Sequence, residues 1–496
     1  MLLDNIAIVG GGTAGLVTAL ILRKTHPNLK IDLIESEKIG IVGVGEGSTE
    51  HWANFTGDCR ISMSELITHT DCTFKYGINF SNWLGDGTNY IHNVSGNMNV
   101  ETQTHSKIMY VYPISEGLGP KSLVMPYIEQ NLHLEPFWGV NQFHFNTFKL
   151  NNYLHTICQE RDIGVIRAEI EQVKLDETGA VDYLIDQEGN KLKYQFYIDS
   201  TGFHRLLLHK AMGVPWRSYN KYLPMNSAIA FPTEKKDDIP SWTLSKAMDS
   251  GWLWRIPTQE RFGNGYVFQD SFMDFDQAQL EVEKLYGQKV EIAKKIKFDA
   301  GCLEKSWVKN CCAIGLSCSF IEPLEASSIG SSIQQAYYFS TAISSYIPGS
   351  TIDYAQRTFN KLSDELLENI VEFVQLHYMT PREDTDFWKS VKNLPKFPSL
   401  EEKLEIWKNK FPSVSEFPSR TVMFKESNYI VVLHGLGLIS KEIAMKELLR
   451  QPKHVQDSIG INYKNMLQDI ELRISKGKAF SHRQALQWLM DNPETV

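Results

Sequence analysis

The stretch that decides the fold is Asn5–Leu20, which reads NIAIVGGGTAGLVTAL. Its short apolar run meets a glycine-rich turn, and an apolar segment with helical spacing follows. Gly10, Gly12 and Gly15 have the G-x-G-x-x-G spacing of a strand, tight turn and helix that bind a dinucleotide. The first glycine permits the turn, the second lets a pyrophosphate approach the backbone, and the third lets the helix pack closely.

An acidic residue after the next apolar run narrows the choice of nucleotide. The run 30–35 ends at Glu35, and Thr13 and Ala14 open the helix whose free N–H groups face the phosphates. A carboxylate at this place accepts hydrogen bonds from both ribose hydroxyls, which a 2′-phosphate would prevent. We therefore expect a doubly wound, Rossmann-like α/β sheet that binds FAD or NAD rather than NADP.

Composition excludes several classes of protein. The chain has 496 residues, 42% hydrophobic and 22% charged, with a formal net charge of −9. This composition suits two or three structural units, and the negative charge argues against a nucleic-acid surface. No run of about 18 apolar residues predicts a membrane span, and glycines interrupt the N-terminal run that a secretory signal would need. The seven cysteines lack zinc spacing, so we expect reduced thiols, no metal site and a cytoplasmic location.

The pattern of elements changes along the chain. Residues 46–100 are rich in Gly, Asn and Thr and predict loops. Alternating segments within 162–198 predict an antiparallel meander, and 216–300 remains strand-rich. Later strands must return to the first sheet, so the body is discontinuous. Helices are expected at 144–160, 276–286, 328–346, 352–378, 398–410, 441–450, 457–475 and 481–491.

Two later strand ends repeat the theme of the first turn. The segment 197–203 reads YIDSTGF, so Asp199 and Gly202 follow a predicted strand, and Gly315 follows another. Many FAD proteins contact the flavin through an acid and a glycine at such a position, although alone they more often form a turn. Taken together with the glycine-rich turn at 10–15, Asp199, Gly202 and Gly315 favour the binding of a large cofactor.

A pair of tryptophans marks a third stretch, 251–257, which reads GWLWRIP. Trp252 and Trp254 stand at i and i+2 and therefore share one face of an extended strand. Two interpretations are open, because large rings on one face either pack the core or separate a flavin from bulky ligands.

Two further stretches carry reactive side chains. Lys75 lies in an aromatic segment, where a lysine usually extends its ammonium into water but becomes a reactive amine if it is buried. Glu325 precedes a helix start at Ser327 and Ser328, where free N–H groups either hold an anion or are simply capped.

Together these stretches resemble the flavin-dependent halogenases, in particular the tryptophan halogenase family, over most of the chain. Trp252, Trp254, Ile256 and Pro257 match the W-x-W-x-I-P signature, which the resemblance implies is a barrier between flavin and substrate. The FKYG segment gives Lys75 the role of the catalytic lysine, and the EPLE segment gives Glu325 that of the catalytic glutamate. Further matching segments are 372–378, Arg382, 384–385, 387–388, 427–429 and 435–437.

The resemblance implies a mechanism. FAD supplied in reduced form, O2 and a halide held at Ser327 and Ser328 yield hypohalous acid. The oxidised halogen reaches Lys75, as a haloamine or as hydrogen-bonded hypohalous acid. Glu325 then polarises the halogen donor or removes the proton from the arenium intermediate. Because the chain shows a single G-x-G-x-x-G, we expect a separate flavin reductase as partner, and a homodimer is the default expectation.

Three departures from the family pattern affect these expectations. Ala326, Ser327 and Ser328 replace the usual Ser-Thr-Gly after EPLE, which changes the local shape. The flavin loop at Gly45, Glu46 and Gly47 lacks the family's proline. The third departure is a missing segment: residues 405–426 contain no Tyr-Tyr-x-x-x-x-Glu, which in tryptophan-specific members of the family clamps the backbone of the amino acid. We therefore expect an indole, a phenol or a similar aromatic substrate rather than free tryptophan. Bromide and iodide are oxidised more easily than chloride, and we expect both to be accepted.

The expected architecture is an FAD-binding body of the aromatic-hydroxylase type over residues 1–330, with an antiparallel sheet facing the substrate. A mainly helical unit over 331–496 covers the substrate site. Two alternatives remain open: an FAD-dependent aromatic monooxygenase, which inserts oxygen, and a non-catalytic FAD-binding redox protein. The tryptophan barrier argues against the first, and the second requires that Lys75 and Glu325 be dispensable.

Overall fold

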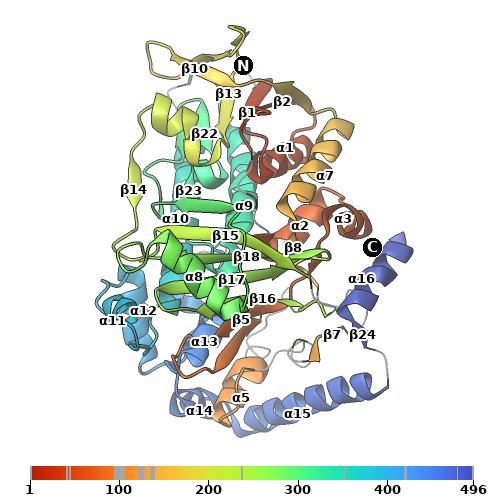
Figure 1. Cartoon of the computed structure of the whole chain (residues 1–496), viewed down its shortest axis with the longest axis vertical. Coiled ribbons are helices and arrows are strands. Elements are labelled where there is room, and N and C mark those ends of the chain that lie inside the picture. The colour runs from red at the N-terminus through yellow and green to blue at the C-terminus, as the bar shows by residue number, and fades with distance from the viewer. Residues whose placement is uncertain are drawn as a thin grey trace.

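The glycine-rich stretch 5–20 folds as predicted. β1 leads through the glycine turn into α1 (Thr13–Thr25), and β2 returns parallel to β1. Strands from much later in the chain join the same sheet, and β13 and β22 run parallel to β1 (Figure 1). The body is therefore discontinuous, as expected. The sheet order is β21 (Trp307–Val308), β22 (Cys311–Ala313), β13 (Phe196–Asp199), β1 (Asn5–Val9), β2 (Lys30–Glu35) and β9 (Gly164–Arg167).

The computed structural model describes residues 3–40, 43, 46–93, 107–120, 128, 130–133, 140–235, 238–350, 353–417, 422–476 and 479–493.

A second sheet lies below the first in Figure 1 and is antiparallel except for the parallel pair β16 and β5. The helix α8 (Phe275–Tyr286) covers one face, where Leu253 and Tyr266 are buried with it. The tryptophans of β17 therefore belong to the opposite face. The sheet order is β19 (Lys294–Lys297), β15 (Ser227–Glu234), β18 (Arg261–Phe268), β17 (Gly251–Pro257), β16 (Trp242–Ala247), β5 (Gly77–Ser81) and β6 (Asn89–Asn93).

Two predictions made from local composition were wrong. Residues 46–93 are not mainly loop, because they form α2 (His51–Asp58), α3 (Met63–Thr70) and four strands, two of which flank Lys75. The antiparallel meander holds only for β10 (Ile170–Leu175), β11 (Val181–Asp186) and β12 (Lys191–Leu192). The flanking strands β9 and β13 join the parallel sheet instead, because pairing depends on distant partners that the local pattern does not name.

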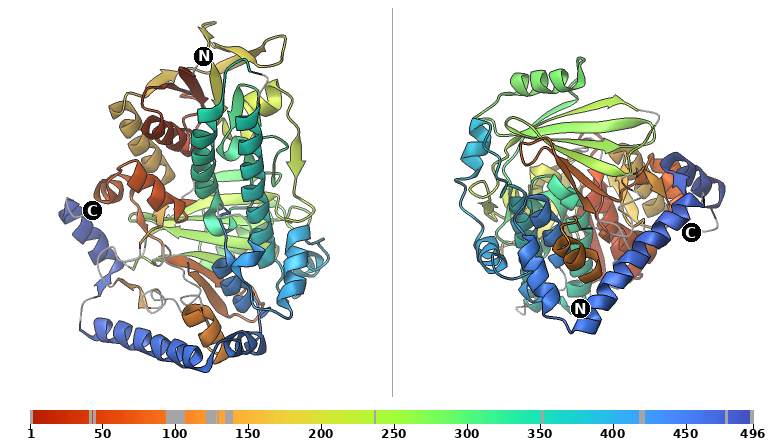
Figure 2. Two further views of the ribbon diagram at one scale, coloured as in Figure 1. Left: turned by 180° about the vertical axis from the view of Figure 1, so that it is seen from behind. Right: turned by 90° about the horizontal axis from the view of Figure 1, so that it is seen from below.

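The helical character predicted from about residue 328 onward is confirmed. α9 (Ser327–Ala342) packs against α1 and against α10 (Tyr354–His377), and Figure 2 shows the two long helices side by side. The division at residue 330 stays a prediction. The following helices are α11 (Asp386–Val391), α12 (Pro398–Trp407), α13 (Glu426–Gly435), α14 (Lys441–Leu449), α15 (Lys453–Ser475) and α16 (His482–Asp491), of which α11 and α13 were not predicted.

Smaller elements connect these layers. The predicted helix at 144–160 begins only at Thr147, because the residues before it form β8. The remaining elements used below are β3 (Glu46–Gly47), β4 (Thr73–Phe74), β7 (Leu132–His133), β8 (Phe143–Phe145), α7 (Thr147–Glu160), β14 (Trp216–Ser218), β20 (Gly301–Leu303), β23 (Ser319–Phe320), β24 (Phe480–Ser481) and α5 (Tyr112–Ser115).

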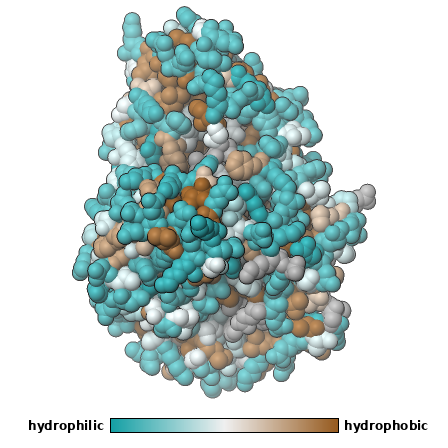
Figure 3. Space-filling model, viewed as in Figure 1, coloured by the Kyte–Doolittle hydropathy of each residue, from teal (hydrophilic) through white to brown (hydrophobic). Residues whose placement is uncertain are grey.

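The surface is mainly hydrophilic on the face drawn in Figure 3, where apolar residues are scattered rather than joined in a band. Within the described ranges, no helix combines the length and the apolar character needed to cross a bilayer. All seven cysteines are buried and free, as their spacing predicted.

Candidate active site

The turn after β1 has a shape that only glycine allows at two of its positions, 10 and 15. Gly10 has φ +119°, and a Cβ there would lie 2.1 Å from the carbonyl oxygen of Ser200. A Cβ on Gly15 would lie 2.0 Å from the carbonyl oxygen of Gly10. Gly12 differs, because a Cβ there would meet no protein atom within 4 Å. The turn thus leaves open space over Gly12, where the fingerprint places a pyrophosphate.

The helix that follows the turn offers donors to this space. In the described structure no side chain caps α1, and its first turn carries no acidic residue. The N–H groups at Thr13 and Ala14 are therefore suited to a phosphate. Gly315 (φ +77°) lies against the same turn, since a Cβ there would be 2.5 Å from the Cβ of Ala14. These residues fit an FAD pyrophosphate.

Other predicted cofactor residues have protein partners of their own. Glu35 ends β2 and accepts a hydrogen bond of 2.9 Å from Nε2 of His155. Asp199 accepts four hydrogen bonds, from the backbone N–H groups of 201, 207 and 208 and from the Thr201 hydroxyl. Gly202 follows in a short helical turn with φ +63°. Their roles toward FAD stay predictions.

The flavin loop is only partly described. Gly45 lies outside the described residues. Glu46 pairs with Phe145 in the sheet of β3 and β8, and burial raises the pKa of its carboxyl to about 7. Gly47 lies between the two predicted catalytic segments, because a Cβ there would be 3.5 Å from Nζ of Lys75 and 3.4 Å from the Cβ of Ala326.

Replacing Gly12 with alanine tests the cofactor site without disturbing the fold. The methyl group meets only open space in the protein, so the unfolding free energy of the flavin-free chain should fall by less than about 1 kcal/mol. The same methyl should weaken FAD binding about tenfold or more, or about 1.4 kcal/mol, because it occupies the place of the pyrophosphate. Flavin fluorescence titration measures the affinity, and Gly57→Ala in α2 is the control. If both variants bind FAD with equal affinity, this turn is not the FAD site.

Lys75 lies in the interior between β4 and β5 rather than extending into water. Its side chain is 1% exposed, and its Nζ donates a hydrogen bond of 2.7 Å to the carbonyl oxygen of Ser48. Burial lowers the pKa of the Lys75 amine to about 8, although the charges of Glu325 and Glu50 raise it. A large fraction of this amine is therefore uncharged in mildly basic solution, the form that can attack an electrophile.

Glu325 is also buried, 3% exposed, in a backbone conformation that few residues adopt. Its φ is +68° and that of Ala326 is +53°, so two consecutive non-glycine residues are left-handed. Such geometry costs about 1–3 kcal/mol per residue and is concentrated at functional sites. Burial on its own raises the pKa of Glu325, but His92 and His377 outweigh it and lower that pKa to about 2.

The two carboxylates of the EPLE segment lie in opposite environments. The Glu322 carboxylate accepts hydrogen bonds from the Tyr378 hydroxyl and, at 3.3 Å, from the Met225 N–H. Burial raises the pKa of Glu322 to about 7, whereas Glu325 is fully ionised near neutral pH. The two carboxyls of one short segment therefore differ in charge near neutral pH.

The predicted halide residues begin α9. The N-cap is Ala326, and in the described structure no side chain caps this helix, so its first N–H groups are open to an anion. Ser327 is buried and Ser328 is half-buried. Both line a small cavity whose other walls are Leu316, Ser319, Phe320, Ile321, Ser331, Leu367 and Ile370.

The residues of the predicted barrier lie on one buried strand, β17. Trp252 and Trp254 have ring centroids 6.1 Å apart, and a Cβ on Gly265 of β18 would collide with the Trp254 ring at 2.0 Å. Ile256 is buried, and the carbonyl oxygen of Pro257 accepts a hydrogen bond of 2.7 Å from the Thr73 hydroxyl. The strand thus ends beside the segment that carries Lys75.

Three side chains near Lys75 and Glu325 were not predicted. His92 and His377 flank Glu325, and Nε2 of His482 in α16 accepts a hydrogen bond of 2.9 Å from the N–H of Phe74, next to Lys75. His377 belongs to a segment that matched the family pattern, but the pattern assigned no role to His377. His92 and Glu325 are 233 positions apart, and Phe74 and His482 are 408 positions apart. A local sequence pattern cannot indicate contacts between residues so distant in the chain.

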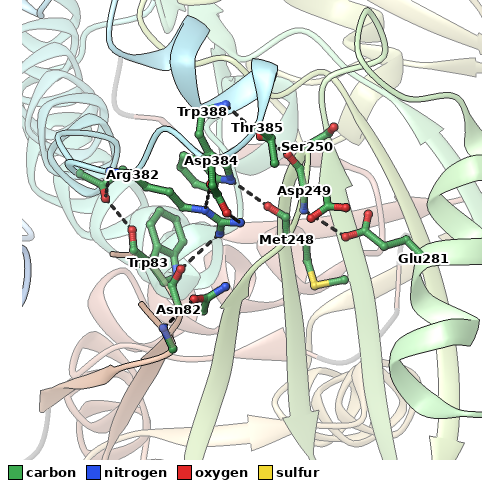
Figure 4. Close-up of polar contacts among 12 residues, drawn as sticks. Asn82, Trp83, Met248, Asp249, Ser250, Glu281, Arg382, Asp384, Thr385 and Trp388 are labelled. Atoms are coloured by element: carbon green, nitrogen blue, oxygen red, sulfur yellow. Dashed lines mark hydrogen bonds and ion pairs between the residues drawn. The ribbon is translucent and has the colours of Figure 1, made fainter. Parts of the chain in front are cut away.

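Arg382 and the matching segments 384–385 and 387–388 form a structural link. Arg382 donates to Asp384 and, at 3.2 Å, to the carbonyl oxygen of Asn82 (Figure 4). Trp388 donates its Nε1–H to the carbonyl oxygen of Met248 at 2.8 Å. These bonds join the end of α10 and α11 to the loops of β5 and β16, and so fix the helix that carries His377.

Comparison with known proteins identifies the family of the chain. The family model described as tryptophan halogenase matches residues 5–451. Tryptophan 6-halogenase SttH of Streptomyces toxytricini is 29% identical over 478 residues, which cover 88% of this chain and 90% of that protein. Its solved structure has a TM-score of 0.85 at 25% identity and covers 98% of this chain and 99% of its own.

Two further solved structures share the fold. Xcc4156, a flavin-dependent halogenase from Xanthomonas campestris, has a TM-score of 0.86 at 25% identity, covering 99% of this chain and 98% of its own. A tryptophan halogenase from Shewanella frigidimarina has a TM-score of 0.88 at 24% identity, covering 99% and 98%. Since the family model spans most of the sequence, the chain belongs to the tryptophan halogenase family and is a flavin-dependent halogenase.

Proposed function

We propose that this halogenase acts on an electron-rich aromatic substrate other than free tryptophan, such as an indole or a phenol, and that Lys75 delivers the halogen. The observation that carries the proposal is the buried amine of Lys75, which lies across Gly47 from Ala326 and within the electrostatic influence of Glu325. An interior amine of lowered pKa can take an oxidised halogen without contact with bulk water.

The substrate class follows from a missing clamp. Residues 405–426 contain no Tyr-Tyr-x-x-x-x-Glu, the segment that the resemblance associates with holding the backbone of free tryptophan. The structure describes 405–417 and 422–426 of this segment. An aromatic compound without a free amino-acid group needs no such clamp.

The chemistry divides between cofactor and chain. Reduced FAD, with O2 and a halide ion, supplies hypohalous acid. The N–H groups of Ser327 and Ser328 hold the halide, and Trp252, Trp254, Ile256 and Pro257 keep the aromatic substrate from the flavin. The Lys75 amine binds the hypohalous acid or exchanges a proton for the halogen with release of water. The halogen then passes to a ring carbon, and the ring proton leaves to a base such as Glu325. Electrophilic substitution is poorly selective, so the position of the ring decides which carbon reacts.

Reducing equivalents come from another protein in this proposal. The chain has one G-x-G-x-x-G fingerprint, and we assign it to FAD, which leaves no second fingerprint for a nicotinamide cofactor. A separate flavin reductase is therefore the expected partner, in the cytoplasm, and a homodimer is the expected assembly.

Mass spectrometry of products tests this function directly. The enzyme is incubated with FAD, a flavin reductase and chloride, bromide or iodide, against a panel of indoles, phenols and free tryptophan. We expect a mass gain of one halogen on an indole or phenol, with tryptophan about tenfold slower or worse, and no turnover when the reductase is omitted. A gain of oxygen in place of halogen, or tryptophan as the best substrate, would contradict the proposal.

A further inference from the structure

The carboxylate of Glu325 is held between two histidines that the sequence did not single out. Nδ1 of His92 lies 2.8 Å from both carboxylate oxygens, and Nε2 of His377 lies 2.8 Å from Oε1. His92 comes from β6 and His377 from the last turn of α10, and both side chains are fully buried. Because water is excluded, the other partner of each ring decides where its protons lie.

The other partner of His92 makes this ring neutral. Nε2 of His92 lies 3.2 Å from Nδ2 of Asn428. The amide orientation of Asn428 is fixed, because its Oδ1 accepts a hydrogen bond of 2.8 Å from the N–H of Lys425. Asn428 therefore offers a donor, and Nε2 of His92 must accept. The ring keeps one proton, on Nδ1, which it donates to Glu325.

The other partner of His377 has the opposite effect. Nδ1 of His377 lies 3.0 Å from the carbonyl oxygen of Phe373, which can only accept. Nδ1 must therefore carry a proton. The second nitrogen faces a carboxylate oxygen, so one more proton lies between Nε2 of His377 and Oε1 of Glu325. Wherever that proton sits, the pair of side chains has no net charge.

We propose that His377 is an imidazolium paired with Glu325, and that this neutral pair keeps the proton affinity of the Lys75 amine low, which favours the uncharged form that accepts an oxidised halogen. His377 thus acts as a positioning residue, because it controls the charge near Lys75 without touching the substrate. The proposal rests on the role given to Lys75 above. Its test measures protons rather than products, so the two proposals can fail separately.

The charged groups around the site support this role. Burial lowers the pKa of Lys75 to about 8, while the charges of Glu325 and Glu50 oppose the change. Tyr90 faces Glu325 and stays neutral, because burial holds its pKa well above the usual range. His144 faces Lys75 and is also neutral, because burial holds its pKa well below the usual range. With the His92 ring assigned as neutral by its hydrogen bonds, the His377 imidazolium offsets the charge of Glu325.

Nitrogen NMR of histidine in the wild-type protein tests the protonation directly. The chain has 14 histidines, and ring-15N labelling separates neutral rings from imidazolium. At pH 8 we expect one ring with protons on both nitrogens, and its signal should disappear in His377→Gln. His155→Gln is the control, since His155 also contacts a carboxylate. A His377 ring that is singly protonated at pH 8 would overturn the proposal, and this measurement needs no variant to keep activity.

A matched pair of variants separates charge from hydrogen bonding. Glutamine at 377 keeps a neutral N–H donor at the Nε2 position but carries no charge, and asparagine at 92 keeps the neutral donor of Nδ1. Titration of 13Cε-labelled lysine, with Lys75 assigned by the signal lost in Lys75→Met, follows the amine. We expect His377→Gln to raise the proton affinity of Lys75 about tenfold or more, or one pKa unit, because Glu325 loses its counter-charge. His92→Asn should shift it less than about twofold.

The two variants also guard against a merely structural effect. Both should be checked for a wild-type thermal transition, since each leaves the volume of the site nearly unchanged. If His377→Gln leaves the Lys75 titration unchanged, or if His92→Asn shifts it as much, the charge of His377 does not control the amine and the proposal fails.

Discussion

Lys75→Met should abolish halogenation of every substrate while hypohalous acid continues to form. Methionine keeps the length and volume of the buried side chain, so the site does not collapse, but it removes the amine. We expect the rate of ring halogenation to fall about 1,000-fold or more, which is about 4 kcal/mol in the barrier. Products are measured by mass spectrometry, and a diffusible chlorination reporter measures hypohalous acid released to solution.

The control for this variant is a lysine far from the site. Lys464 on α15 is exposed, and Lys464→Met should leave both readings at the wild-type level. If Lys75→Met still halogenates the substrate at a tenth of the wild-type rate, free hypohalous acid is the halogenating species and the buried amine is dispensable.

Glu325→Gln should have the second largest effect, because it removes the charge from the carboxylate that both His92 and His377 contact. Glutamine has the same shape, but its amide cannot serve as a base or balance the imidazolium of His377. We expect the halogenation rate to fall about 100-fold or more. Breaking a buried charged pair should also lower the free energy of unfolding by about 3 kcal/mol, visible in urea unfolding.

The matched control comes from the same EPLE segment. The pKa of Glu322 is raised by burial to about 7, so near pH 6.5 its carboxyl is largely protonated and resembles an amide. Glu322→Gln should therefore change the rate at pH 6.5 less than about threefold. Equal losses in the two variants would mean that both act through the packing of the segment and that the charge of Glu325 has no special role.

The part of the fold that could be read from the sequence is the part governed by neighbours in the chain. The turn from β1 to α1 needs glycine at 10 and 15 for steric reasons alone, and a sequence displays those glycines directly. The strand pairing of 164–167 and 196–199 was misjudged, because β9 and β13 pair with strands more than a hundred positions away. Alternation of polar and apolar residues gives no information about a distant partner.

In the candidate site, too, local motifs could be predicted from the sequence, whereas contacts between distant segments could not. Lys75 and Glu325 could be named from motifs, but their protonation depends on what surrounds them. Whether Lys75 is buried or extends into water was undecided from sequence, and the structure resolves it at 1% exposure. His92 and His377 meet Glu325 only because β6 and α10 converge on the start of α9. Such convergence is a property of the packed chain and leaves no trace in any single segment.

The contact between His482 and Phe74 bears on how the enzyme is made. It joins residues 408 positions apart, and the family match ends at residue 451, before α16 begins. During synthesis the N–H of Phe74, beside Lys75, therefore cannot form this hydrogen bond until α16 has been translated. A growing polypeptide on the ribosome lacks this contact. We therefore expect the site around Lys75 to be complete only after the segment around 482 has packed against β4.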